Sequence, residues 1–262
     1  MVRTVQAVRY VLPLREGSSV PALVEGDDLG LYVVKLSGAG QGPKALVAEL
    51  VAGELARALS LDVPEIVLVD LDRALAASEP DPELFAPLDA SAGVNVGLDY
   101  LPGSVTVDPV AGPPPDATTA SRIVLFDALV TNVDRTPKNP NLLFWHGRIW
   151  LIDHGASLYF HHGWAKANRL EGSDDPFVEI QRHVLLPWAS KLAEAARHVE
   201  KTVTSTLIDE IVGQIPAAWL SPDDAFPDPD AHRSAYGAWL RQRVSKLSTF
   251  LEEAERARAL AV

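Results

Sequence analysis

The chain contains no cysteine, so it can form neither disulfides nor thiolate metal sites. It has no apolar run that approaches the ~18 residues needed to cross a bilayer. Residues 1–15 alternate apolar and polar side chains and lack the continuous apolar stretch of a secretory signal. We therefore expect a cytoplasmic protein without a membrane span.

Basic residues are also scarce: 23 lysines and arginines stand against 35 aspartates and glutamates, and the net charge at pH 7 is −12. Binding to nucleic acids depends on Lys and Arg that neutralise phosphates, so no nucleic-acid partner is expected. A local basic pocket for a single nucleotide is compatible with this charge. With 262 residues and 47% hydrophobic side chains, the chain can bury a sizeable core in one large domain or two small lobes.

The first hundred residues predict a small sheet and one helix. Five β-like runs predict strands at Val5–Leu12, Val20–Val24, Leu31–Leu36, Ile66–Leu71 and Val94–Tyr100. The turns between the first three contain the Gly and Asp residues that tolerate positive φ, which predicts an antiparallel meander. Residues 43–59 are rich in Ala, Leu and Glu and predict a helix with Pro43 in its first turn. The acidic, proline-containing segment 73–91 is interpreted as a surface excursion.

The rest of the chain is predicted to be mostly helical. The proline-rich segment 108–115 has the composition of a linker. Helices are expected at Thr118–Thr131, Leu185–Thr204 with an interruption near Pro187, Leu207–Ile215 and Asp230–Ala259. Three histidines between the first two of these helices, His161, His162 and His183, are interpreted as loop residues.

The segment 134–153 carries the chemistry that the sequence indicates. Asp134 precedes Asn139 with four residues between them, which is the spacing of a kinase catalytic loop. Apolar runs at 142–145 and 148–152 predict a β-hairpin, which would return Asp153 to the end where Asn139 lies. The two side chains could then share one cation through oxygen ligands, which suits Mg²⁺. Taken singly, each residue could equally be an ordinary turn former.

A lysine and a glutamate in the first third predict a buried ion pair. Glu49 is the only charged residue in the segment 45–52. A carboxylate in such apolar surroundings is costly unless it is paired. Lys35, in the third predicted strand, is its natural partner, and we expect their charged atoms within about 4 Å. The alternatives are a lysine that extends from a strand end to solvent and a glutamate on a narrow polar edge.

Together these features resemble the HipA-like kinase family, bacterial relatives of the phosphatidylinositol 3/4-kinases within the protein-kinase-like fold. The segment Asn-Val-Asp-Arg-Thr-Pro-Lys-Asn at 132–139 resembles the N-x-D…N catalytic loop of that family. Asp-His-Gly at 153–155 stands where protein kinases have Asp-Phe-Gly. The resemblance implies an α+β, two-lobed protein-kinase-like fold, with a small antiparallel β-rich N-lobe with one helix at 1–103 and a mainly helical C-lobe at 104–262.

The resemblance also implies roles for the residues already singled out. Asp134 would be the base or the carboxylate that orients the acceptor hydroxyl. Asn139 and Asp153 would bind Mg²⁺. Lys35 and Glu49 would hold the phosphates of ATP.

Two further segments receive a nucleotide-binding role only from the resemblance. Gly17, Ser18 and Ser19 would lie over the phosphates, as the glycine-rich loop does in kinases. One of the two serines could be a regulatory phosphorylation site, as in the HipA family, or part of an ordinary polar turn. Asp99 and Tyr100 stand where kinases have the hinge that binds adenine through backbone groups.

The expected activity is transfer of the γ-phosphoryl group of ATP to a hydroxyl acceptor, which could be a protein serine or threonine or a small molecule. One alternative is a nucleotide-binding pseudokinase that acts as a regulatory module. Another is a metal-dependent hydrolase that uses the same Asp and Asn residues, although that reading gives Lys35 and Glu49 no role.

Overall fold

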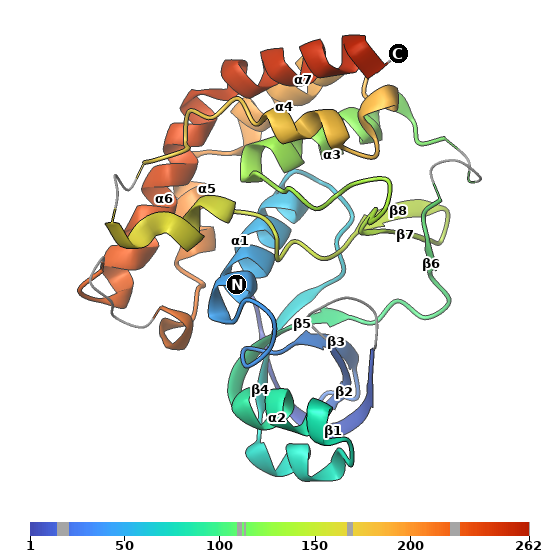
Figure 1. Cartoon of the computed structure of the whole chain (residues 1–262), viewed down its shortest axis with the longest axis vertical. Helices are drawn as coiled ribbons and strands as arrows, with labels where there is room; N and C mark the ends of the chain where they lie inside the picture. Colours follow the sequence, from blue (N-terminus) through green and yellow to red (C-terminus); the bar gives the residue numbers. More distant parts are fainter. Residues whose placement is uncertain (15–20, 109–111, 113, 167–169, 221–225, 262) are drawn as a thin grey trace.

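The computed structural model describes residues 1–14, 21–108, 112, 114–166, 170–220 and 226–261. Figure 1 shows a small β barrel at one end of the molecule and a group of helices at the other. The barrel strands are β1 (Thr4–Pro13), β2 (Ala22–Gly26), β3 (Leu31–Lys35), β4 (Ile66–Leu71) and β5 (Gly93–Asp99). The five predicted strands are therefore present, with small shifts of their ends.

The barrel has the strand order β1-β2-β3-β5-β4 and is closed. β1, β2 and β3 pair antiparallel, as the meander prediction required. The closure was not predicted: β1 pairs in parallel with β4, through residues 4–6 and 68–70. A parallel pair needs a long crossover, and here helix α1 lies within that connection. The expectation of a purely antiparallel sheet is therefore corrected.

The barrel has its own small core, and one glycine is essential to its packing. Val24, Val67 and Val69 are completely buried inside it. Gly97 on β5 lies opposite these side chains, and a Cβ atom added there would stand 2.6 Å from Cγ2 of Val69 and 3.0 Å from Cγ2 of Val67. The interior at this level has no room for another methyl group.

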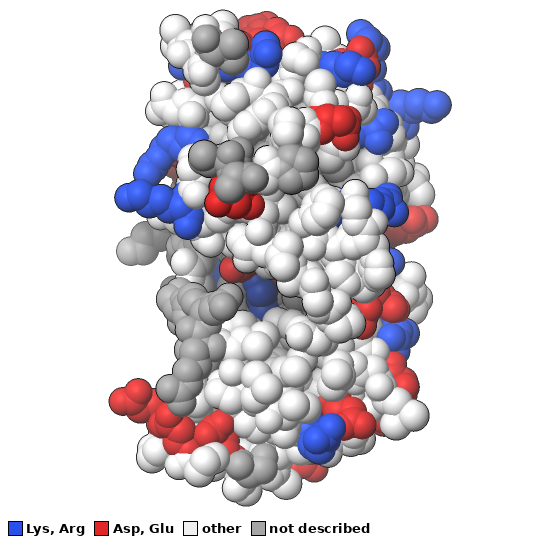
Figure 2. Space-filling model, turned by 90° about the vertical axis from the view of Figure 1, so that its right-hand side faces the viewer, with Lys and Arg blue, Asp and Glu red and all other residues white. Residues whose placement is uncertain are grey.

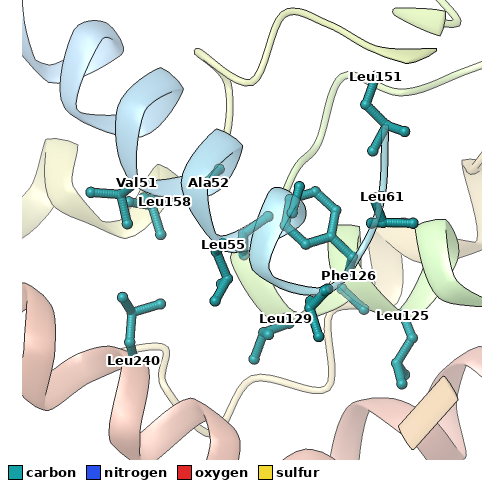
Figure 3. Packing of buried hydrophobic residues seen from close by; sticks show 14 of the residues in the cluster. Val51, Ala52, Leu55, Leu61, Leu125, Phe126, Leu129, Leu151, Leu158 and Leu240 are labelled. Atoms are coloured by element: carbon teal, nitrogen blue, oxygen red, sulfur yellow. The ribbon is translucent and has the colours of Figure 1, made fainter. Parts of the chain in front are cut away.

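Helix α1 (Pro43–Ala58) links the barrel to the helical part. Residues on nearly every face of this helix are buried, which explains why its sequence lacks a polar face. Figure 3 shows Leu55 of α1 near Phe126 and Leu129 of α3 (Ala117–Val130), and Val51 of α1 beside Leu158. One continuous core contains residues of α1, of β4 and β5, and of the C-terminal helices.

The remaining elements complete the helical part and a second sheet. They are the 3₁₀ segment η1 (Arg73–Ser78), α2 (Pro82–Ala90), the strands β6 (Val105–Thr106), β7 (Leu142–Trp145) and β8 (Arg148–Leu151), and the helices α4 (Leu192–Thr202), α5 (Ser205–Val212), α6 (Pro229–Ser245) and α7 (Leu247–Ala261). β6, β7 and β8 form one antiparallel sheet. Short 3₁₀ segments at Tyr159–Lys166, Val178–Arg182, Leu186–Trp188 and Ala217–Trp219 join the helices.

Three expectations about helices are corrected. The surface excursion at 73–91 contains η1 and α2, whose first turns are capped by the side chains of Asp72 and Asp81. These elements give the first 103 residues more than the single helix that was predicted. The expected interruption near Pro187 is confirmed by a separate 3₁₀ turn there, but the second predicted helix begins later than expected, at Leu192. The expected final helix is two helices, because the chain leaves helical geometry at Lys246.

Among the described residues, no helix combines the length and the apolar character that crossing a bilayer requires.

Replacing Gly97 by Ala tests the packing of the barrel. We expect the free energy of unfolding to fall by about 1–3 kcal/mol, the usual cost of forcing a methyl group into a filled core. Gly163→Ala is the matched control, since a Cβ there meets nothing within 4 Å. Urea denaturation of both variants checks this, and an unchanged midpoint for Gly97→Ala would show that the barrel interior adapts freely.

Candidate functional site

The predicted ion pair is present and forms the centre of the site. Nζ of Lys35, at the end of β3, lies 2.7 Å from Oε2 of Glu49 on α1. The same ammonium group also contacts Oδ1 of Asp153. Glu49 has no exposed surface, whereas 44% of the Asp153 side chain is exposed. We call Lys35, Glu49 and Asp153 the lysine–carboxylate cluster. Glu49 is its buried member, and Asp153 is the member that a ligand can reach.

The charges of this cluster stabilise one another. Burial by itself would lower the pKa of Lys35, but the charges of Glu49 and Asp153 outweigh it and hold the pKa above its usual value. Burial alone would likewise raise the pKa of Glu49, and the charge of Lys35 instead keeps it low. Both groups are therefore ionised at neutral pH.

His154 gives Glu49 a second partner. Its Nδ1 lies 3.3 Å from Oε1 of Glu49, and its ring packs edge-on against Phe126 of α3. The residue is completely buried. The middle position of the Asp-His-Gly motif therefore contacts α1 and α3 at once, which links the motif to the carboxylate that holds Lys35.

The predicted catalytic loop brings Asp134 and two asparagines together. Nδ2 of Asn139 donates to Oδ2 of Asp134 at 2.8 Å, and Nδ2 of Asn141 lies 3.4 Å from the same oxygen. The Asp134 N–H donates to Oδ1 of Asn132 at 3.1 Å. Asn141 was not among the predicted site residues, although it follows Asn139 by only two positions. One oxygen of the Asp134 carboxylate thus receives two amide donors.

The predicted β-hairpin explains how the loop and the Asp-His-Gly motif meet. β7 and β8 pair antiparallel from Leu142 opposite Leu151 to Trp145 opposite Arg148. The residues that flank the hairpin, Asn141 and Asp153, have φ values of 50° and 56°. This left-handed region is uncommon outside glycine, and Asn and Asp tolerate it better than other residues.

The two aspartates of the site are close enough to affect each other. Partial burial raises the pKa of Asp134, and the negative charge of Asp153 raises it further. Repulsion of this kind fits a position where a bound cation would relieve it. Among the described residues, no three His, Asp or Glu side chains gather in a metal-binding arrangement. A metal here would depend on Asp153, an amide oxygen and oxygens of the substrate, which is how Mg²⁺ is commonly held.

Two of the three histidines that were interpreted as loop residues are buried. His183 contacts Oδ2 of Asp127 at 2.9 Å, next to the catalytic loop. His161 contacts the hydroxyl of Tyr236 on α6 at 3.0 Å, and its burial lowers its pKa well below the usual value. No hydrophobic periodicity marks either residue in the sequence, because each belongs to or directly follows a short 3₁₀ segment.

Two segments received a nucleotide-binding role from the family resemblance alone. Gly17, Ser18 and Ser19 lie outside the described residues. Asp99 and Tyr100 lie at the end of β5, and their N–H groups donate to the carbonyls of barrel residues at 2.9 and 2.8 Å. A hinge at this position would therefore have to bind adenine through other backbone groups.

Figure 2 shows the face of the molecule on the side of β6, β7 and β8, with a recess at mid-height where basic and acidic side chains are visible together. A separate cavity of about 870 Å³ lies between this sheet and the start of α3. Its lining includes Leu61, Val105, Arg122, Phe144 and Ile149. No residue of the lysine–carboxylate cluster lines it, so this cavity is not part of the candidate site.

The chain is similar to known kinases in sequence and in fold. The model of a family described as HipA-like kinase matches residues 8–242. The solved structure of the proinflammatory kinase CtkA from Helicobacter pylori superposes with a TM-score of 0.59 at 13% identity, covering 97% of this chain and 99% of that one. The two chains therefore share a protein-kinase-like fold. No curated protein sequence matches the chain significantly.

Two structures of a Golgi casein kinase are also similar. One covers 98% of this chain and 74% of the other at 13% identity. The second, with Mn and ADP bound, covers 100% and 75% at the same identity. Their TM-scores of 0.48 and 0.49 are too low to establish a shared fold.

A double-mutant cycle on the unfolding free energy tests the central ion pair. Lys35→Met leaves Glu49 buried without its cation and should cost about 3–5 kcal/mol. Glu49→Gln should cost less, since Asp153 still neutralises Lys35, and the double variant should lose at least about 1 kcal/mol less than the sum.

The exposed pair Arg241–Asp209, whose charged atoms lie 2.6 Å apart, is the control cycle. Its coupling energy should not exceed about 1 kcal/mol. Equal coupling in both cycles would mean that burial adds nothing to the Lys35–Glu49 interaction.

Proposed function

The chain belongs to the HipA-like kinase family, and on that premise we propose that it transfers the γ-phosphoryl group of ATP to a hydroxyl acceptor with the help of Mg²⁺. One observation carries the proposal: a single lysine joins a buried glutamate to the half-exposed aspartate of the Asp-His-Gly motif. Phosphoryl transfer requires such a cation for the phosphates beside a carboxylate for the metal.

Lys35 is suited to hold the α- and β-phosphates. An ammonium group has three hydrogen-bond donors, and Glu49 and Asp153 take two of them. The third can be given to a phosphate oxygen. Glu49 keeps the ammonium group charged and prevents it from turning away, so the cation is already oriented before ATP arrives.

Asp153 and Asn139 are the residues we assign to the metal. Asp153 offers exposed carboxylate oxygens, and the amide of Asn139 can donate its N–H to Asp134 while its oxygen serves as a ligand. When bound, Mg²⁺ neutralises charge on the phosphate oxygens. Asn141 offers a second amide within reach of the Asp134 carboxylate.

Asp134 is assigned to the acceptor. Its carboxylate can accept the proton of the acceptor hydroxyl while that oxygen forms its bond to the γ-phosphorus and ADP leaves. Burial and the charge of Asp153 raise the pKa of Asp134, which makes it a better proton acceptor than an ordinary aspartate. Asn139 orients it from one side.

We assign residues 1–103 to an N-lobe and residues 104–262 to a C-lobe, with ATP between them. The segment with Gly17, Ser18 and Ser19 would close over the phosphates, and the region of Asp99 and Tyr100 would contact the adenine. The acceptor class stays open between a protein serine or threonine and a small molecule.

Asp153→Ala should abolish the magnesium-dependent stabilisation of the protein by ATP and leave the fold intact, because it removes a half-exposed carboxylate and little core volume. Thermal-shift curves with ATP, with and without Mg²⁺, give the measurement, since a ligand stabilises only the state that binds it. Asp230→Ala, at an exposed position on α6, is the control and should shift like the natural protein. A full shift in Asp153→Ala would remove Asp153 from the site.

Asp134→Ala should retain the thermal shift with Mg-ATP but lose phosphotransfer by at least ~10²-fold, the usual scale for a positioned acid–base group. Release of ADP or incorporation of labelled phosphate at saturating ATP is the measurement. Turnover near the natural rate would refute the assignment of Asp134. If the natural protein binds Mg-ATP but gives no turnover with protein and small-molecule hydroxyl acceptors supplied, it is a pseudokinase.

A further inference from the structure

A second buried carboxylate lies behind the catalytic loop. Asp127 on α3 has no exposed surface. Its Oδ1 accepts from Nδ2 of Asn132 at 2.9 Å, and its Oδ2 accepts from Nε of Arg135 at 2.6 Å. Nε2 of His183 lies 2.9 Å from the same Oδ2. Three side chains from the catalytic loop and the segment after it therefore meet on one helix residue.

Arg135 also contacts the backbone beside the residues that flank the hairpin. It directly follows Asp134 and is almost completely buried. Its Nη1 donates to the carbonyl of Asn141 and lies 3.5 Å from the carbonyl of Ile152, the residue before Asp153. One rigid guanidinium thus contacts the backbone at both ends of β7–β8.

The backbone at both ends of the hairpin has an unfavourable conformation. Asn141 and Asp153 both have left-handed φ angles. Such conformations cost about 1–3 kcal/mol each and persist only where the surroundings hold them. The contacts of Arg135 lie on the Asn141 carbonyl itself and on the peptide that precedes Asp153. They are therefore placed to hold both residues in the orientation that the site uses.

His183 fixes the other side of Asp127. The N–H of Leu185 donates to Nδ1 of His183 at 3.0 Å, so the ring proton is on Nε2 and points at the carboxylate. Burial lowers the pKa of His183, in keeping with a neutral ring. The N–H of Val184 also donates to the carbonyl of Arg135 at 3.1 Å. The segment after residue 170 is thereby joined to the catalytic loop.

Stability does not explain why an ion pair occupies this position. Replacing a buried ion pair by well-packed apolar side chains is often neutral or stabilising, because desolvation of the charges offsets their attraction. The planar fork of a guanidinium, in contrast, orients several acceptors at once. We infer that Arg135, held by Asp127, is a positioning residue of the phosphotransfer site, which orients Asn141 and Asp153 through their backbone; this rests on the proposed function.

Arg243 on α6 is a natural control for a role in folding alone. It is as buried as Arg135, and it donates to the carbonyls of Leu129 and Ala128 on the same turn of α3 that carries Asp127. It also donates to the carbonyl of Asp175, and its guanidinium lies 4.3 Å from the centre of the Phe250 ring. It makes the same kind of interaction but touches neither the catalytic loop nor the hairpin.

The test compares Arg135→Lys with Arg243→Lys in the full chain. Lysine keeps the positive charge but cannot reproduce the planar set of donors of the guanidinium. At saturating Mg-ATP, Arg135→Lys should lower kcat about 10²-fold, the scale of a 1 Å misplacement at a reacting centre. Arg243→Lys should lose a similar amount of stability in urea and keep kcat within about threefold. Equal losses of kcat in both variants would overturn the inference.

Two further measurements cover the other outcomes. If Arg135→Lys does not fold, His183→Leu removes one hydrogen bond of Asp127 without changing the guanidinium. Its kcat should then fall several-fold, and an unchanged kcat would overturn the inference.

If the natural protein has no turnover, the proposed function fails. The NMR signals of the Asp134 and Asp153 carboxyl carbons then decide: they should move in Arg135→Lys and not in Arg243→Lys, and unmoved signals in both would overturn the inference.

Discussion

The carboxylate of Glu49 is completely buried on a helix that is apolar on nearly every side, and the rest of the site depends on how its charge is neutralised. Lys35 supplies the counter-charge from the end of β3, so the barrel and α1 must meet at that point. Because the same ammonium group reaches Asp153, the Asp-His-Gly motif is drawn to the same place. A single electrostatic requirement thus joins the barrel, the crossover helix and the segment after the hairpin. Two buried opposite charges attract each other and offset part of their desolvation cost, whereas either charge alone would strongly destabilise the fold.

The second buried carboxylate, Asp127, repeats this arrangement on α3. Each of the two acids lies between one cation and one histidine: Lys35 and His154 for Glu49, Arg135 and His183 for Asp127. In the first set, the ammonium group of Lys35 also contacts the half-exposed Asp153 and keeps a third donor for a ligand. The second is closed and directs its remaining contacts to backbone carbonyls. The two sets differ in exposure, because only the cation of the first set also contacts a half-exposed aspartate. This difference supports the proposal that the first set binds the nucleotide and the second positions the site.

The parts of the site that could be predicted are those with a local signal. The spacing of Asp134 and Asn139 and the hairpin between Asn139 and Asp153 are properties of neighbouring residues. In the structure Asn139 donates to Asp134, and the two strands of the hairpin pair. Lys35 and Glu49 could be paired in advance because a lone charge in an apolar helix needs a partner. Asp127 and His183 gave no such signal. An acid within a helix and a histidine in an irregular segment become informative only when the fold places them 2.9 Å apart across 56 positions of sequence.

The sequence by itself determined the strands of the barrel, the buried helix after β3, the catalytic-loop spacing and the family resemblance, because each depends on composition or on spacing along a short stretch of chain. Only the tertiary structure decided the parallel pairing that closes the barrel and the single core that joins α1 to the C-terminal helices. It also decided which acids are buried and which cations they receive. The physical reason is that these features are set by contacts between distant segments. Burial, and with it the cost of an unpaired charge, is a property of the folded molecule.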